Sequence, residues 1–144
     1  MAKSKDSYTR DVKNQKIELG KLLKECRGER SLRNVAAAVG LSPSNLKYIE
    51  DGVNAPSPEI YIKLMHELEP KSKVKKDIEH AYMLIRQAPP PDVCKVITDN
   101  ENLNDSLRIL EGYTLTQQQS KELDSLLNSF IKRIIISNDK GNKY

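Results

Sequence analysis

The stretch AAAVGLSPSNLKYIEDG, residues 36–52, carries the clearest local pattern in the chain. Small residues lead into Gly40, and Ser42 followed by Pro43 opens a second run that is mostly polar. Glycine adopts the left-handed conformation that ends a helix, serine caps the start of a helix, and proline fits its first position. The stretch therefore predicts two short helices joined by a tight turn around Gly40.

Helical periodicity extends on both sides of this pair. Apolar residues recur at spacings of three and four, and serine, glycine or proline marks the ends of most segments. The segments predicted up to residue 87 cover 14–27, 32–39, 43–51, 58–68 and 72–87. They predict an all-α domain over residues 14–87. Residues 1–13 have no apolar period and are predicted to form a flexible arm.

The second half of the chain begins at a proline-rich break, APPPD, residues 88–92. Three consecutive prolines cannot continue a helix and favour a stiff spacer, so a linker and a domain boundary are predicted here. A helix that pauses in the polar TDNEN segment should follow, and then a last helix opened by a Thr116–Gln119 capping box. These helices make up a small helical region, 93–136, before a disordered tail, 137–144.

The excess positive charge lies in the first half of the chain. The formal net charge is +4, and residues 1–75 hold 15 Lys and Arg against 10 Asp and Glu, whereas residues 76–144 hold 9 against 10. An anionic partner would therefore bind the first half. A basic tail together with ordinary solvated helix faces would give the same balance, so charge alone leaves both interpretations open.

Several classes of protein are disfavoured by what the sequence lacks. No apolar run approaches the ~20 residues needed to cross a bilayer, and the N-terminus is polar and basic, so we expect a cytoplasmic protein with no membrane partner. Cys26 and Cys94 are too few for a disulfide framework and are expected to be reduced. His66 and His80 are isolated, and no zinc-ligand spacing, glycine-rich phosphate loop or hydrolase motif occurs. We therefore expect no metal, no cofactor and no enzymatic activity.

The helix pair of residues 36–52 matches an arrangement that many proteins use to place one helix in the major groove of DNA. Its second helix would bury Leu46 and Ile49 and expose a polar face with Asn45, Lys47 and Tyr48. Helical hairpins with a glycine turn are also common in proteins that do not bind DNA. Periodicity by itself fits either kind of protein.

The segment SLRNVAAAVGLSPSNLKYIEDGVNAPSPEIYIKLMHEL, residues 31–68, resembles the Cro/C1-type (XRE-like) helix-turn-helix family of phage and bacterial regulators. The matching features are the Ser-Leu-Arg start of the second helix, Ala36, Gly40 with the following Leu-Ser, Ile-Glu-x-Gly at 49–52, and PSPE before the fourth helix. With the flanking helices the similarity covers about residues 14–87. It implies a five-helix, lambda-repressor-like domain that binds double-stranded DNA.

The resemblance also implies roles for individual residues. The third helix is expected to enter the major groove, with base contacts from Ser44, Lys47 and Tyr48. The residues expected to contact phosphates are Arg30, Arg33, Asn45 and Asn54.

Two positions depart from the common pattern of this family. Leu32 stands where many members carry a phosphate-binding glutamine, so that contact is assigned to Arg30 or Arg33. The glutamate of the third helix, here Glu50, usually pairs with a basic residue of the first helix, for which Lys24 is the candidate. Glu50 is therefore expected to have a structural role.

The resemblance implies a sequence-specific transcriptional regulator, a repressor that occupies its operator as a homodimer. The last helix carries an apolar stripe, and its candidate dimer contacts are Leu123, Leu127, Phe130 and Ile134. The same stripe could instead pack on the helices predicted at 93–111 and 72–87. The alternative function is a protein-interaction module, antitoxin-like or anti-repressor, with a protein partner at the C-terminal region, or a ligand-sensing regulator.

Overall fold

The chain folds into helices joined by short connections. The computed structural model describes residues 5–141, and this part of the chain contains eight helices and no strand. The helices are α1 (Lys5–Arg27), α2 (Leu32–Val39), α3 (Pro43–Glu50), α4 (Pro58–Leu68), α5 (Ser72–Arg86), α6 (Pro91–Thr98), α7 (Glu101–Ile109) and α8 (Gln117–Gly141). The predicted all-α class is confirmed.

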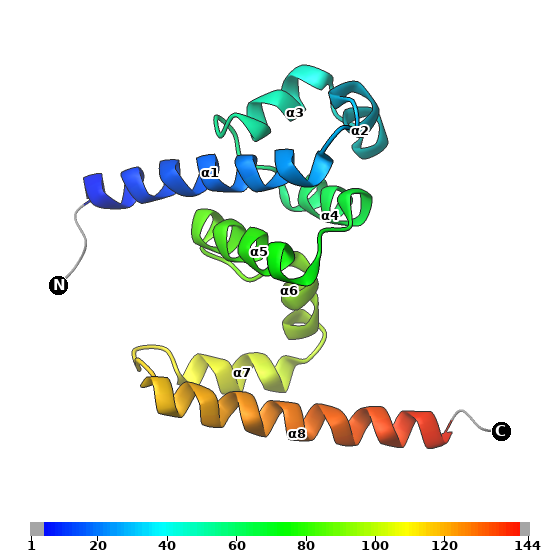
Figure 1. Ribbon diagram of the computed structural model, residues 1–144. Coiled ribbons are helices and arrows are strands. Elements are labelled where there is room, and N and C mark those ends of the chain that lie inside the picture. The colour runs from blue at the N-terminus through cyan, green and yellow to red at the C-terminus, as the bar shows by residue number, and fades with distance from the viewer. Residues whose placement is uncertain (1–4, 142–144) are drawn as a thin grey trace. The chain divides into compact units, whose positions relative to one another are not determined.

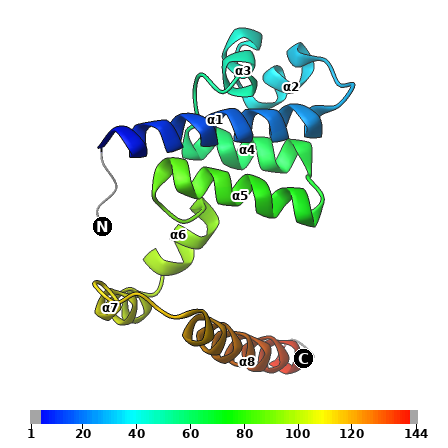
Figure 2. The ribbon, with the colours of Figure 1, turned by 60° about the vertical axis from the view of Figure 1, so that its left-hand side comes forward.

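The structure divides after Asn100 into two compact units. In the first unit α1 packs against α3 on one side and α5 on the other, while α2 packs against α3 and α4 (Figures 1 and 2). The buried apolar core consists of Leu19, Leu23, Val35, Ala36, Val39, Leu46, Ile49, Tyr61, Leu64, Ile78, Ala81 and Tyr82. All five helices from α1 to α5 contribute to this core, so they form one packed body.

An aromatic pair fixes α4 against α5 within this body. The rings of Tyr61 and Tyr82 stack with 4.0 Å between their centroids and 27° between their planes. Such a pair contributes ~0.5–1.5 kcal/mol beyond the apolar area that it buries. Burial also raises the pKa of the Tyr61 phenol, so this side chain stays neutral inside the core.

The predicted starts of three helices are confirmed by their caps. The hydroxyl oxygens of Ser31, Ser42 and Ser57 each accept a hydrogen bond from the backbone N–H three residues further on, at 3.0–3.3 Å. Gly40 ends α2 in the left-handed conformation, with φ of 75°. Local side-chain chemistry therefore sets where α2, α3 and α4 begin.

Two glycines allow α1 to lie directly against the backbone around the end of α3. A Cβ atom added to Gly20 would lie 2.3 Å from the carbonyl oxygen of Ile49 and 2.5 Å from that of Glu50. Gly52 has a φ of 75°, and a Cβ there would lie 2.5 Å from the Cα of Ile17. The orientation of α3 is thus set by contact between main chains.

The prediction of a flexible arm at residues 1–13 is wrong for residues 5–13, which are helical in α1. The missing apolar period shows that a segment is not buried on one face, but a helix that is anchored further along can extend without burial. No Gly or Pro interrupts this extension. The tail prediction is likewise wrong for residues 137–141, which continue α8. Residues 1–4 and 142–144 lie outside the described part.

The proline-rich segment at residues 88–92 is not the domain boundary that was predicted. Pro91 is the first residue of α6, Pro90 is buried, and the division between the units falls after Asn100. The thiol of Cys94 donates to the carbonyl oxygen of Pro89 at 3.3 Å and fixes this turn. The prolines therefore end α5 and start α6, because proline suits the first position of a helix. The predicted pause in TDNEN is confirmed between α6 and α7.

The second unit contains α7 and α8. The predicted capping box opens α8: the Thr116 N–H donates to the Gln119 side-chain oxygen at 2.9 Å, and the Gln119 N–H donates to the Thr116 hydroxyl at 3.2 Å. Among residues 101–139 no side chain is buried. The described side chains of this unit thus form no core of their own.

Candidate nucleic-acid interface

Helix α3 has one buried face and one exposed polar face. Leu46, Ile49 and Glu50 are buried, and Ile49 lies beside Gly20 of α1. The three residues predicted to contact bases, Ser44, Lys47 and Tyr48, are exposed together on the other side, with Tyr48 49% exposed. Their spacing of three and four residues places them on one surface of the helix. The structure therefore brings the predicted base-contacting residues together.

Lys47 is paired with an acidic neighbour on its own helix. Its ammonium lies 2.9 Å from the Asp51 carboxylate one turn further on, and this hydrogen bond raises the pKa of Lys47. Both side chains are exposed, and solvent screens exposed pairs of this kind so that they contribute little to stability. Lys47 can therefore leave Asp51 at small cost when a stronger anionic or polar partner approaches.

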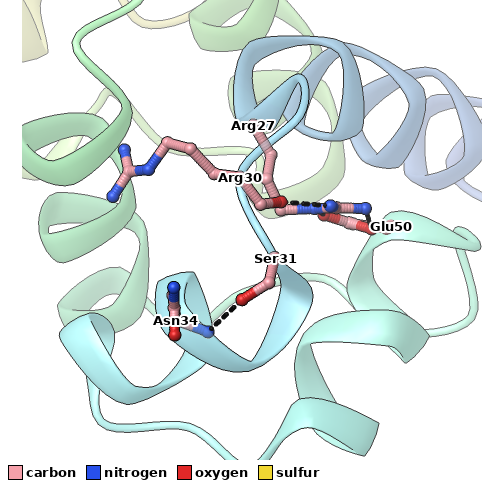
Figure 3. A network of polar contacts seen from close by, with 5 residues as sticks. All are labelled: Arg27, Arg30, Ser31, Asn34 and Glu50. Atoms are coloured by element: carbon pink, nitrogen blue, oxygen red, sulfur yellow. Dashed lines mark hydrogen bonds and ion pairs between the residues drawn. The ribbon is translucent and has the colours of Figure 1, made fainter.

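The ion pair expected of Glu50 is present, but its partner is Arg27 rather than Lys24 (Figure 3). Arg27 Nε lies 2.7 Å from Glu50 Oε1, and Nη2 lies 3.1 Å from Oε2, so the contact is bidentate. The Glu50 side chain is only 5% exposed, and the hydrogen bond raises the pKa of Arg27. Arg27 is the last residue of α1, and its guanidinium ties that end to the end of α3.

The four residues predicted to contact phosphates are all exposed, but one of them makes a tertiary contact. Arg33, Asn45 and Asn54 are exposed, in the first turns of α2 and α3 and in the loop after α3. Arg30 instead extends towards α4, where it pairs with the Glu67 carboxylate and donates to the Glu67 carbonyl oxygen at 3.1 Å (Figure 3). The structure thus gives Arg30 a tertiary contact at an exposed position, and its contact with phosphate stays a prediction.

Basic residues that sequence reasoning missed lie beside the loop after α3. An open groove of ≈ 550 Å³ is lined by Lys13, Lys16 and the segment 51–53. A neighbouring groove of ≈ 440 Å³ brings Lys16 and Arg86 next to Asn54. Lys13 belongs to the segment predicted as a flexible arm, whereas Lys16 and Arg86 belong to predicted helices in which nothing local indicates that they lie beside this loop. Lys16 and Arg86 thus place positive charge beside Asn54.

Within residues 5–141 no group of three or more His, Cys, Asp or Glu side chains comes together as a metal site. None of the helices in this range is both long and apolar enough to span a membrane. Comparison of the chain with protein-family models, with curated proteins and with solved structures gives no match.

Proposed function

We propose that α1–α5 form a lambda-repressor-like helix-turn-helix domain of the Cro/C1 type, and that the protein is a sequence-specific DNA-binding regulator. The observation that carries this proposal is the exposed face of α3. A capped helix buries Leu46, Ile49 and Glu50 and presents Ser44, Lys47 and Tyr48 to solvent. Tertiary contacts hold this helix firmly, while its polar side chains are exposed to solvent.

In the proposed complex α3 lies in the major groove, which is ~12 Å wide and admits one helix. Lys47 donates to the O6 and N7 atoms of guanine, and Ser44 and Tyr48 contact neighbouring base edges. Arg33, Asn45 and Asn54 bind phosphates and set the register, and Lys16 adds positive charge beside Asn54. No catalytic group or cofactor takes part. The protein represses by occupying an operator as a dimer and excluding polymerase.

The proposal is tested by footprinting and gel shift with the DNA that flanks the protein's own gene. A random duplex of equal length serves as competitor, and salt concentration is varied because phosphate contacts make affinity strongly salt-dependent. Protection of a short site that survives random competitor supports the proposal. Equal affinity for the flanking DNA and random DNA, at every salt concentration, would contradict it.

Lys47→Ala should weaken binding to the specific site by ~1–3 kcal/mol, with a smaller loss on random DNA, because a base contact is removed. Lys95→Ala is a matched control. Helix α6 also has proline first and lysine fifth, and Asp99 pairs with Lys95 as Asp51 does with Lys47. The control should leave affinity for both DNAs within about twofold. Gel-shift titrations decide, and an equal loss on specific and random DNA for Lys47→Ala would place the wrong face of α3 in the groove.

Arg33→Ala should act differently, because a phosphate contact carries no sequence information. The variant should weaken specific and random binding alike, and it should reduce the slope of log affinity against log salt by about one unit. Affinity measured at several salt concentrations checks this. An unchanged slope would remove Arg33 from the interface.

A protein-interaction module is the second candidate function, favoured by the exposed apolar side chains of the second unit. An antitoxin-like protein or an anti-repressor would bind another protein through them. Recovery of one stoichiometric protein partner, together with the absence of any specific DNA site, would support this function over the first.

A further inference from the structure

Helix α8 carries a broad apolar face that the described residues of the second unit leave exposed. Its members are Leu123, Leu126, Leu127, Phe130, Ile131, Ile134 and Ile135, and all except Leu123 are between 41 and 70% exposed. The face runs continuously for more than three turns of the helix. The Arg133 guanidinium lies over the Phe130 ring, 5.6 Å from the ring centroid. A continuous apolar face of this kind marks an interaction surface.

The order of residues along this face points to a second copy as the occupant. Leu123, Leu127, Phe130 and Ile134 alternate in spacings of four and three, the pattern of helices that pair side by side. Six of the seven members are also arranged symmetrically about a midpoint between residues 128 and 129, and the seventh, Ile135, lies opposite Glu122. Leu127 and Phe130, Leu126 and Ile131, and Leu123 and Ile134 lie at equal distances from that point. Two copies in opposite directions would therefore place each of these residues level with its apolar counterpart.

The charged residues of α8 also favour antiparallel pairing of the two helices. Glu122 and Asp124 precede the midpoint, whereas Lys132 and Arg133 follow it. Glu122 and Arg133 are separated by about three turns and thus lie on the same flank of the helix. Antiparallel pairing brings Glu122 of each copy near Arg133 of the second copy. Parallel pairing would instead bring like charges together, which is unfavourable.

We propose that two copies of this protein associate through α8, with the helices antiparallel and a two-fold axis between residues 128 and 129. The interface is isologous, because the same surface serves both copies. It also provides the second unit with the buried apolar core that its described side chains lack. This assignment does not depend on DNA binding, and its tests contain no DNA.

The first test measures the mass of the full chain by sedimentation velocity. The wild type should sediment as a dimer, and Phe130→Asp should weaken association by ~100-fold or more, because it places an unpaired charge in an apolar interface. Ile136→Asp is the matched control: Ile136 is 55% exposed, like Phe130 at 52%, but lies off the apolar face. It should remain a dimer. Circular dichroism and thermal melting of each variant check that the first unit stays folded.

The second test determines the relative direction of the two α8 helices from distances between spin labels, measured by double electron–electron resonance. Cys26→Ala and Cys94→Ser remove the native thiols, and single cysteines then replace exposed Gln118 or Ser129. Antiparallel helices place the two labels at position 118 about 30 Å apart, whereas parallel helices place them within about 20 Å. Labels at position 129 should be within about 20 Å in either arrangement, which makes this site the control.

Each outcome has a definite meaning. A monomeric wild type, or dimers that survive Phe130→Asp, would overturn the proposal, and a short distance at position 118 would overturn its direction. A dimer with the expected distances but no specific DNA site would leave this proposal standing and contradict the proposed function. A monomer that protects a specific site would overturn this proposal and the dimeric form of the proposed repressor, but would leave sequence-specific DNA binding standing.

Discussion

Replacing Gly20 with alanine should lower the free energy of unfolding of the first unit by about 3 kcal/mol or more. The added Cβ would lie 2.3 and 2.5 Å from the carbonyl oxygens of Ile49 and Glu50, and these backbone atoms cannot move aside as a flexible side chain can. Helix propensity alone predicts the opposite result, because alanine is favoured over glycine inside a helix by about 1 kcal/mol. Denaturant unfolding followed by circular dichroism therefore distinguishes the two expectations. The steric clash predicts a lower free energy of unfolding, and helix propensity predicts a higher one.

Gly40→Ala is the control for this experiment. Gly40 has a φ of 75°, so alanine is strained there, but nothing lies within 4 Å of an added Cβ. Backbone strain alone should cost only about 1–2 kcal/mol. A Gly20→Ala variant that is as stable as the wild type would show that α1 and α3 do not touch through their main chains.

Arg27→Met should destabilise the first unit by about 3–5 kcal/mol, because it leaves the buried Glu50 carboxylate without its partner. The double variant with Glu50→Leu should recover most of this loss, since a buried ion pair contributes little over apolar residues of similar size. Lys24→Met is the control: Lys24 is exposed and belongs to the same helix, and its replacement should change stability by ~0.5 kcal/mol at most. Equal losses for Arg27→Met and Lys24→Met would contradict the assigned pair.

The pH dependence of this pair follows from the direction of its pKa shift. Glu50 raises the pKa of Arg27, so the contribution of Arg27 to stability is complete below the pKa of arginine in the unfolded chain. It is lost only as pH rises through the raised value in the folded chain. The difference between wild type and Arg27→Met should therefore stay constant from neutral to mildly alkaline pH.

The features that the sequence predicted well depend on local chemistry. Ser42 caps α3 and Pro43 begins it, and the positions of Leu46 and Ile49 define which face is buried. These determinants lie within one or two turns of each other, so periodicity and capping rules are sufficient to find them. The exposure of Lys47 and Tyr48 followed from the same reasoning, whereas the choice of Ser44, Lys47 and Tyr48 as base contacts came from the family resemblance.

The features that the sequence did not predict depend on packing between distant segments. From the sequence alone, several basic residues of α1 could pair with Glu50. Only the packing of α1 against α3 selects Arg27. Nothing local indicates that Arg30 pairs with Glu67, which lies 37 residues away along the chain. Pro91 was ambiguous for another reason: proline both interrupts helices and begins them.

The separation of tasks along α3 has a consequence for how such a protein can diverge. Its attachment to the domain uses Leu46, Ile49, Glu50 and a main-chain contact with Gly20, none of which belongs to the exposed polar face. Substitutions at Ser44, Lys47 or Tyr48 therefore leave the scaffold intact. In the proposed regulator, evolution can thus change the DNA-binding preference by replacing a few exposed residues of α3, without passing through variants that fail to fold.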